Sequence, residues 1–429
     1  VPLVLFSVIS GVANIGDPSS LGRMGGKTLL AYLVTTVLAV SIGLTLVNII
    51  KPGALIDEDS RIDNRISYEV WANDQGYEIK DGINYLQEPE FFERAQRITD
   101  LSKSELKDAS VSEKMETANM TKDSGPLQPL VDLVPQNFFQ SLGDNGLMLQ
   151  IIFFALFFGI CLLFIPNEKS DPVTKIVDSI MEVFLKMVDF VMQAAPFFVF
   201  ALLAGVVSKM AGNDIGKVYE IFKGLSWYSL TVVAGLLFMI FIMYPLILKL
   251  FVKKIPYKGF FKAISPAQTL AFSTSSSAAT LPVTMECVEE NLGVDKKITS
   301  FVLPIGATVN MDGTCLYQAV AVVFLAQLHM IDLTIGQQLI IVVTATLASI
   351  GSAAVPSAGL VMLIIVLDSV GLNPAWIAII FPVDRILDMI RTVVNVTGDA
   401  TVSSIIANGE DMLHYQDHDP SETFDLDSE

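Results

Sequence analysis

The stretch STSSSAATLP, residues 273–282, decides the fold, because it places hydroxyl-bearing and small residues with a proline between two apolar segments. The apolar piece on each side has roughly ten to fifteen residues, which is too few for either piece to cross a bilayer alone. A loop between two ordinary spans is the simpler alternative. The short flanks instead favour a re-entrant helical hairpin, whose freed backbone groups must be satisfied by other protein or by a water-filled cavity.

A second cluster of the same kind occurs later, SIGSAAVPSAG at residues 349–359. Each cluster precedes a longer helical segment that carries an Asn motif, NMDGT at 310–314 and NVTGD at 395–399. Paired Gly, Ser and Pro interruptions at corresponding places are typical of inverted repeats with a binding site between the two halves. The sequence therefore predicts two re-entrant hairpins and an inverted repeat within residues 260–407.

The rest of the chain has the composition of a membrane protein. Of its 429 residues, 52% are hydrophobic and only 17% are charged, unlike a soluble domain of this size. Several apolar runs hold about the twenty residues that a bilayer requires: 29–50, 147–165, 181–207, 226–252, 299–328 and 375–407. We expect an all-α polytopic membrane protein.

The formal charge of −18 is concentrated in two polar segments. Residues 51–125 contain 17 acidic residues and 10 Lys or Arg, and the segment from 408 onward contains 8 acidic residues and no Lys or Arg. Neither is a basic patch, which argues against a nucleic-acid partner. The three cysteines, Cys161, Cys287 and Cys315, have no paired spacing and are predicted to be buried small residues. The three histidines suggest no Ser-His-acid arrangement, so we do not expect an enzyme.

Lysine and arginine positions predict the orientation. Basic residues flank three of the apolar runs, at 23 and 27, at 169 and 175, and between 249 and 262. If these sites are cytoplasmic, the polar segment 55–128 is extracytoplasmic and the acidic C-terminus is cytoplasmic. The chain starts inside an apolar run without a basic leader, which favours a trimmed N-terminus over a signal peptide.

Residues 388–399, DMIRTVVNVTGD, carry three ionisable groups within an apolar run. At about 100° per residue of helix, five polar residues fall within one arc of roughly 100°: Asp388, Arg391, Thr392, Asn395 and Asp399. A charge at the membrane centre costs about 2.5–3.5 kcal/mol, so this face requires partners. A structural ion pair between Asp388 and Arg391 is one alternative, but it leaves the other three residues unexplained.

The residue types indicate an acidic amino acid as the ligand. Arginine binds a carboxylate through two parallel hydrogen bonds, and Asp388 one turn away can accept an ammonium group. Backbone N–H groups at the serine-rich tip can bind the second carboxylate. Asp312 and Asp399 lie in motifs that favour unwound backbone, and carbonyls with one carboxylate suit a monovalent cation such as Na⁺, whereas Ca²⁺ usually requires more carboxylates.

Together, STSSSAATLP, LPIGATVNMDGT, ASIGSAAVPSAG and DMIRTVVNVTGDA resemble the glutamate transporter family, the dicarboxylate/amino acid:cation symporters that include archaeal aspartate transporters and excitatory amino acid transporters. The match runs from residue 1 to about 407, except for the segment 55–125. The resemblance implies the glutamate-transporter fold, a homotrimer in the plasma (inner) membrane, and Na⁺-coupled uptake of L-aspartate or L-glutamate by an elevator-type movement.

The resemblance also implies a division of the chain. Residues 1–54 correspond to family helices 2 and 3, and residues 55–128 form the insertion. Residues 129–259 contain scaffold helices 4 and 5 and transport helix 6. Residues 260–407 form the transport core, with hairpin 1, helix 7, hairpin 2 and helix 8, and residues 408–429 form the tail.

Site residues carry over by position. The implied substrate contacts are Ser275, Ser277, Thr314, Val355, Gly359, Asp388, Arg391, Thr392 and Asn395. One Na⁺ site is implied at Gly306, Asn310, Asn395 and Asp399; a second at Thr308, Met311, Ser349, Ile350 and Ser352; and a third at Tyr32, Thr35, Thr36, Asn310 and Asp312.

Three positions depart from the family pattern. Archaeal members carry an arginine where this chain has Ser275, animal members carry it at Met389, and this chain has neither. Arg385, one turn earlier, is a candidate to reach the same space, and Gln318 replaces a proton-linked glutamate. These departures imply Na⁺ coupling without proton cotransport and give no support to K⁺ countertransport. A C4-dicarboxylate or a neutral amino acid carrier of the same family is the alternative.

Overall fold

The computed structural model describes residues 2–15, 18–75, 84–105, 134–135, 137–143, 147–193, 225–350 and 358–415. Their secondary structure is helical. The first half contains α1 (Pro2–Ile15), α2 (Pro18–Ile50), η1 (Pro52–Leu55), α3 (Glu58–Gln75), η2 (Tyr85–Gln87), η3 (Pro89–Phe91), α4 (Phe92–Glu105), α7 (Phe138–Gly143), α8 (Met148–Leu163) and α9 (Asn167–Gln193). The second half contains α12 (Ser226–Phe238), η5 (Met239–Met243), α13 (Tyr244–Phe251), α14 (Tyr257–Thr274), α15 (Ser277–Glu286), η6 (Cys287–Asn291), α16 (Lys296–Val309), α17 (Asp312–Leu328), α18 (Ile335–Ile350), α19 (Ala358–Ser369), η7 (Pro374–Trp376) and α20 (Ile377–Gly409).

By length and composition, three helical runs in the described chain can cross a membrane: Gly22–Leu55, Ser226–Phe251 and Lys296–Leu328. The third differs from the others, because 94% of its most apolar window is buried inside the protein, against 39% for each of the other two. The run of α16 and α17 is therefore surrounded by other helices, which leaves α2 and the run from α12 to α13 to face a surrounding apolar medium.

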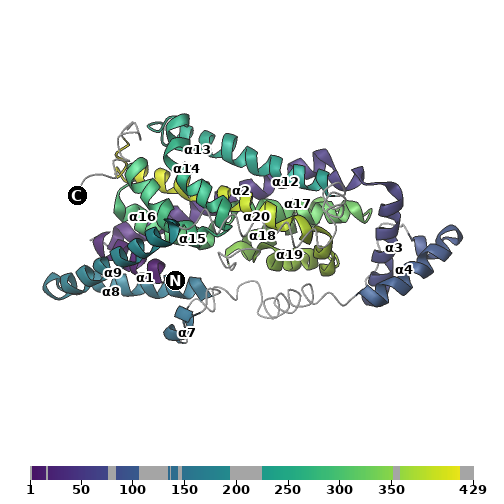
Figure 1. Cartoon of the computed structure of the whole chain (residues 1–429), viewed down its shortest axis with the longest axis horizontal. Helices are drawn as coiled ribbons and strands as arrows, with labels where there is room; N and C mark the ends of the chain where they lie inside the picture. The colour runs from purple at the N-terminus through teal and green to yellow at the C-terminus, as the bar shows by residue number, and fades with distance from the viewer. Residues whose placement is uncertain are drawn as a thin grey trace.

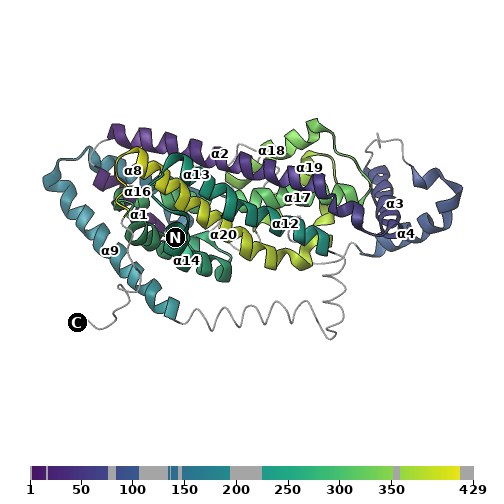
Figure 2. The same cartoon turned by 90° about the horizontal axis from the view of Figure 1, so that it is seen from above.

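The described helices form an elongated bundle with α20 running through its middle (Figures 1 and 2). Helix α17 packs against α2 and α20, and α16 and α14 also pack against α20. Helices α3 and α4 pack on each other and form a lobe at one end of the bundle, while α8 and α9 lie with α1 at the other end (Figure 1). The C-terminal part of α20 and the N-terminal part of α2 are joined by Glu410 with Arg23 and Lys27, each at 2.6 Å.

The serine-rich stretch forms a turn between two helices that pack against each other. Helix α14 ends at Thr274, and Ser275 adopts a left-handed conformation with φ of 52°. Ser276 then caps α15, because its hydroxyl oxygen accepts a hydrogen bond from the amide of Ala279 at 3.2 Å. Helices α18 and α19 also pack together, but residues 351–357 of the second cluster lie outside the described residues.

The two Asn motifs behave differently. At NMDGT the helical backbone is interrupted, since Asn310 and Met311 separate α16 from α17, which confirms the predicted unwinding. At NVTGD the prediction of unwound backbone is wrong, because α20 continues from Ile377 to Gly409. One glycine costs a helix only about 1 kcal/mol, and a Cβ at Gly398 would lie 2.7 Å from the Tyr244 hydroxyl. That glycine serves close packing there.

The described part of the polar segment 55–128 is mostly helical. Arg94 of α4 forms ion pairs with Asp59, at 3.1 Å, and with Asp63 of α3. Cysteine burial was predicted correctly for Cys287 and Cys315 but not for Cys161, which is exposed. Cys161 lies on the same helix as Phe157, which is 59% exposed, so α8 has an apolar face that these helices leave uncovered.

Candidate functional site

Arg391 is the centre of a buried ionic cluster on α20. Its side chain has no exposed surface. Nη2 donates a hydrogen bond to Oδ1 of Asp388 at 2.6 Å and lies 3.0 Å from Oδ1 of Asp384. Nε and Nη1 have no hydrogen-bond partner among the described residues. The arginine therefore has compensated charge but unused donors.

Helix α17 and the start of α19 enclose this arginine. The guanidinium lies 3.9 Å from the ring centroid of Tyr317, a cation–π contact. A Cβ at Gly359 would lie 3.3 Å from Nη1 of Arg391 and 2.9 Å from the Thr314 methyl group. Gln318 donates a hydrogen bond to the carbonyl of Gly359 at 3.1 Å. Predicted substrate contacts from three helices thus meet within a few ångströms.

Sequence reasoning missed two members of this cluster, Asp384 and Tyr317. Asp384 is seven residues before Arg391, so it falls in the same arc of α20 as the other polar residues. Extending the arc by one turn would have found it. Tyr317 follows Thr314 by three residues and therefore shares its face of α17, but an aromatic residue in an apolar helix carries no sequence signal that distinguishes it from core.

Thr392 and Asn395 are positioned by local and by distant bonds. The Thr392 hydroxyl donates to the carbonyl of Asp388 at 2.9 Å, one turn earlier. The side-chain Oδ1 of Asn395 accepts a hydrogen bond from the backbone amide of Gly313 at 2.9 Å, and its Nδ2 contacts the sulfur of Met311 at 3.4 Å. Asn395 therefore joins α20 to the interruption before α17.

The predicted residues of the two tips are only partly brought to this cluster. Ser275 and Ser277 are buried, 3% and 4% exposed, in the turn between α14 and α15, and both helices pack against α20. The Ser275 hydroxyl has no hydrogen-bond partner among the described residues. Val355, predicted for the second tip, lies outside the described residues.

A second polar cluster surrounds Asp399. Its Oδ1 accepts a hydrogen bond from the Asn310 amide at 2.8 Å, and that amide also donates to the carbonyl of Asn395 at 3.1 Å. A Cβ at Gly306 would lie 2.3 Å from both Asp399 Oδ1 and the Tyr32 hydroxyl. Only glycine fits there. The four residues predicted for the first cation site are therefore adjacent, and the buried Oδ1 of Asn310 accepts no hydrogen bond within the described chain.

Asp312 forms a third cluster with α2 and α13. Its Oδ1 accepts from the Thr36 hydroxyl at 2.7 Å, and its Oδ2 accepts from the Tyr244 hydroxyl at 2.8 Å. Tyr32 and Thr35 are also buried on α2, and the Thr35 hydroxyl donates to the carbonyl of Tyr32 at 3.0 Å. The predicted α2 residues thus meet the predicted carboxylate, and Tyr244 is an additional neighbour that the sequence did not indicate.

The remaining predicted cation site is described only in part. Thr308 is buried, and its hydroxyl donates to the carbonyl of Ile305 at 3.0 Å. Met311 is buried at the helix interruption. Ser349 and Ile350 end α18 with no described side-chain positions, and Ser352 lies outside the described residues.

Each of these two clusters combines one buried carboxylate with neutral hydroxyl or amide groups. Asp312 and Asp399 are buried, and each is accompanied by hydroxyl, amide or carbonyl oxygen groups. Within the described ranges, no group of three His, Cys, Asp or Glu residues is placed to hold a metal ion. One carboxylate among neutral oxygens suits an alkali cation better than Ca²⁺, which usually draws several carboxylates.

The family departures have definite positions. Met389 is buried at 1% exposure, so the position at which animal members carry an arginine holds an apolar side chain here. Nη1 of Arg385 lies 3.9 Å from Oδ2 of Asp388, at the limit of an ion pair. The sequence-based suggestion that Arg385 reaches this space is therefore compatible with the geometry.

Comparison with known proteins extends over nearly the whole chain. The model of the sodium:dicarboxylate symporter family matches residues 1–408. An excitatory amino acid transporter of Caenorhabditis elegans is 38% identical over 412 residues, covering 94% of this chain and 77% of the relative. Excitatory amino acid transporter 3 of Oryctolagus cuniculus and of Homo sapiens are each 37% identical, covering 94% of this chain and 75% of the relative.

Proposed function

Because the chain belongs to the sodium:dicarboxylate symporter family, we propose that it is a Na⁺-coupled symporter of the acidic amino acids L-aspartate and L-glutamate. The family consists of multi-pass membrane transporters and not of enzymes. The observation that carries the substrate assignment is Arg391, a fully buried guanidinium with two unused donor atoms beside Asp388.

The substrate's side-chain carboxylate binds Arg391 in this proposal. The guanidinium has two edges with paired donors, Nε with Nη2 and Nη1 with Nη2, so Nη2 belongs to both. In the structure Nη2 is engaged by Asp388 and Asp384. A carboxylate that binds through two hydrogen bonds therefore competes with these aspartates for Nη2. Displacement of Asp388 frees its carboxylate to accept the substrate's ammonium group, so one exchange creates both contacts.

The remaining substrate contacts are proposed at Thr314, Gly359, Thr392 and Asn395, with the α-carboxylate at the tips formed by Ser275, Ser277 and Val355. Na⁺ is transported with the substrate. The oxygen groups around Asp399 and Asp312 support two of the proposed cation sites. Asn395 supplies a mechanical link between substrate and cation, because the carbonyl of Asn395 accepts from Asn310 while its side chain faces Gly313.

For the architecture we propose the arrangement that the resemblance implied. Residues 260–407 form a transport core with two re-entrant hairpins and inverted repeats, and this core moves as an elevator against scaffold helices of a homotrimer. The Ser275 turn and the α18–α19 pair support hairpins at these places. The segment 55–128 is extracytoplasmic and the tail 408–429 cytoplasmic in the plasma (inner) membrane.

Uptake of radiolabelled L-aspartate and L-glutamate into proteoliposomes tests the function. We expect concentrative uptake with an inward Na⁺ gradient, and none with Na⁺ equal on both sides. Varying internal K⁺ and external pH in the same assay tests coupling to other ions, with no dependence on a proton gradient expected because of Gln318. Aspartate movement only down its own gradient, indifferent to Na⁺, would refute the symporter assignment.

A C4-dicarboxylate carrier is the second candidate, favoured by the dicarboxylate in the family's description. Such a substrate has no ammonium group and makes no use of Asp388. Competition of succinate against labelled aspartate separates the two candidates, since a dicarboxylate carrier binds succinate at least as tightly. A neutral amino acid carrier is disfavoured, because its substrate has no side-chain carboxylate to accept hydrogen bonds from the unused Nε and Nη1 of Arg391.

A further inference from the structure

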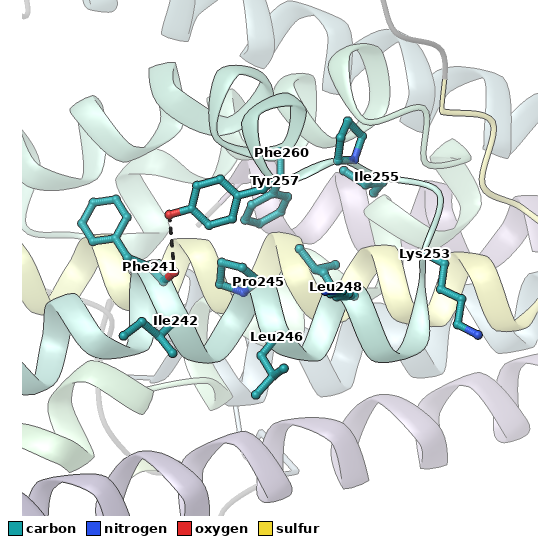
Figure 3. Close-up of a pocket in the computed structure, with 11 residues that line it drawn as sticks. Phe241, Ile242, Pro245, Leu246, Leu248, Lys253, Ile255, Tyr257 and Phe260 are labelled. Carbon is teal, nitrogen blue, oxygen red and sulfur yellow. Dashed lines mark hydrogen bonds between the residues drawn. The ribbon is translucent and has the colours of Figure 1, made fainter.

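A groove of ≈ 590 Å³ lies between the η5–α13 run and the beginning of α14 (Figure 3). Its volume is within the range of small-molecule sites, about 300–1,000 Å³. Apart from two lysines, the residues that line it are aliphatic, aromatic or proline. None of them belongs to the buried substrate and cation clusters.

A proline in the sequence explains the local geometry of one wall of the groove. Pro245 has no N–H to donate to the carbonyl of Phe241 four residues earlier, and the helix adopts π geometry over Met239–Met243 just before it. The Tyr257 hydroxyl donates to that carbonyl at 3.4 Å, as the dashed line in Figure 3 shows. Tyr257 thereby connects the start of α14 to the η5–α13 run at one end of the groove.

The groove opens on an apolar surface. Phe241, Ile242 and Leu246 are 50%, 52% and 48% exposed, and all three line it. They belong to the run Ser226–Phe251, which is long and apolar enough to cross a membrane. In a bilayer these side chains face hydrocarbon, so an acyl chain can enter the groove without leaving the lipid phase.

The opposite end of the groove is cationic. Lys249 and Lys253 line it, and Figure 3 places Lys253 at the end away from Tyr257. Neither lysine has a hydrogen bond or ion pair from its side chain within the described chain. Residues 221–285 contain no Asp or Glu at all. Lys253 also adopts φ of 55°, a left-handed conformation that favours glycine, so its position is maintained against backbone preference.

We propose that this groove binds an anionic phospholipid of the bilayer. One acyl chain lies along Phe241, Pro245 and Leu246, and the phosphate contacts Lys249 and Lys253. Phe241 and Lys249 are eight residues apart, about 12 Å along a helix, so the chain segment lies in hydrocarbon while the headgroup is at the lysine-rich end. A zwitterionic lipid has the same phosphate but also a cationic ammonium group, so it neutralises the two lysines less than an anionic lipid does. This proposal is independent of the transported substrate.

The test counts lipids bound to the purified full-length protein by native mass spectrometry, during titration with dioleoyl phosphatidylglycerol or dioleoyl phosphatidylcholine. We expect the first to bind more tightly. Lys249→Gln with Lys253→Gln should weaken phosphatidylglycerol binding about tenfold, since each lysine near an anionic headgroup contributes measurably. The matched control, Lys254→Gln with Lys258→Gln, removes the same charge from residues that do not line the groove and should stay within about twofold of the parent.

A second pair of variants tests the apolar part. Leu246→Trp should occlude the groove and reduce phosphatidylglycerol binding, whereas Leu250→Trp, at a 61% exposed residue of the same helix that does not line the groove, should not. Equal losses in both lysine pairs would reduce the effect to general charge attraction and overturn the proposal. The proposal would also be overturned if both lipids bound equally well or if Leu246→Trp left phosphatidylglycerol binding unchanged. It would likewise be overturned if oleate displaced bound lipid at the same concentration as phosphatidylglycerol does.

Discussion

Among the described residues, two arginines have no exposed surface, Arg65 on α3 and Arg391 on α20. They differ in whether their guanidinium donors have hydrogen-bond partners within the protein. Nε of Arg65 donates to Glu69 at 2.8 Å, and Nη1 donates to the carbonyl of Met330 at 3.4 Å. The other carboxylate oxygen of Glu69 accepts from the amide of Leu86 at 3.0 Å. This pair joins α3 to the end of α17 and has its bonds made within the protein.

Arg391 has more counter-charge than Arg65, two carboxylates against one, but fewer hydrogen bonds. Two aspartates engage Nη2, while Nε and Nη1 have no partner in the described chain. An unmade hydrogen bond in a buried group costs about 1–3 kcal/mol, which a ligand can recover. Burial of a charge alone therefore does not identify a binding site. The unused donors of Arg391 are the observation that supports the proposed substrate site.

The largest expected effect is a loss of stability when the buried Arg65–Glu69 ion pair is broken. Arg65→Met leaves the Glu69 carboxylate buried without its cation, which should lower the free energy of unfolding by about 3–5 kcal/mol. Thermal unfolding of the detergent-purified protein measures the change. The double variant Arg65→Met with Glu69→Leu should recover most of the loss, because no buried charge remains. Unchanged stability in the single variant would show that this pair is not structural.

The next largest effect is on substrate binding at Arg391, whose Nε and Nη1 have no hydrogen-bond partner in the described chain. Arg391→Cys removes the proposed carboxylate site and should weaken L-aspartate binding about a hundredfold or more, equivalent to ~3 kcal/mol, and neutral amino acids should compete better than before. Arg391→Lys retains the charge against Asp384 and Asp388 but loses the planar two-donor edge, so it should fold and still bind aspartate poorly. Aspartate affinity equal to the parent in either variant would refute the role of Arg391.

A smaller effect distinguishes ammonium binding at Asp388 from carboxylate binding at Arg391. Asp388→Asn should weaken L-aspartate binding about tenfold, ~1.4 kcal/mol, because the ammonium group loses its anionic acceptor. Asp384 remains within 3.0 Å of Arg391, so the arginine keeps a counter-ion and the variant should fold. Succinate, which has no ammonium group, should compete as well as before. If both ligands weaken equally, Asp388 acts by positioning Arg391 and not by direct contact.

The smallest effect concerns an ion pair at the surface. Hydrogen bonds from Arg23 and then Lys27 lower the pKa of the Glu410 carboxyl below its ordinary value of 4.5. Its contribution is therefore fully present above about pH 4.5 and is lost as the pH falls through the lower pKa of the folded protein. Exposed pairs contribute about 0.2–1 kcal/mol. Glu410→Gln should lower thermal stability slightly at pH 7, and the difference from the parent should shrink as the pH falls below about 4.5.

Local pattern predicted much of the fold. Apolar runs anticipated α2, α8, the run from α12 to α13, and α20, because a helix in a membrane must satisfy its own backbone. Asn and Gly at 310–314 anticipated the interruption before α17. The same reasoning failed at NVTGD, where the Thr397 hydroxyl donates to the Val393 carbonyl at 2.6 Å within an unbroken helix. A lone glycine costs little, and packing decided the outcome.

The sequence by itself determined that one face of α20 is polar within an apolar chain, since helical periodicity follows from residue order alone. Only the tertiary structure decided how that face is used. The contacts of Asn395 with Gly313, Asn310 with Asp399, and Thr36 with Asp312 join residues 82, 89 and 276 positions apart. Contacts between residues so far apart in the sequence depend on how the helices pack. The same packing determines which buried donors have a partner within the protein and which remain available to a ligand.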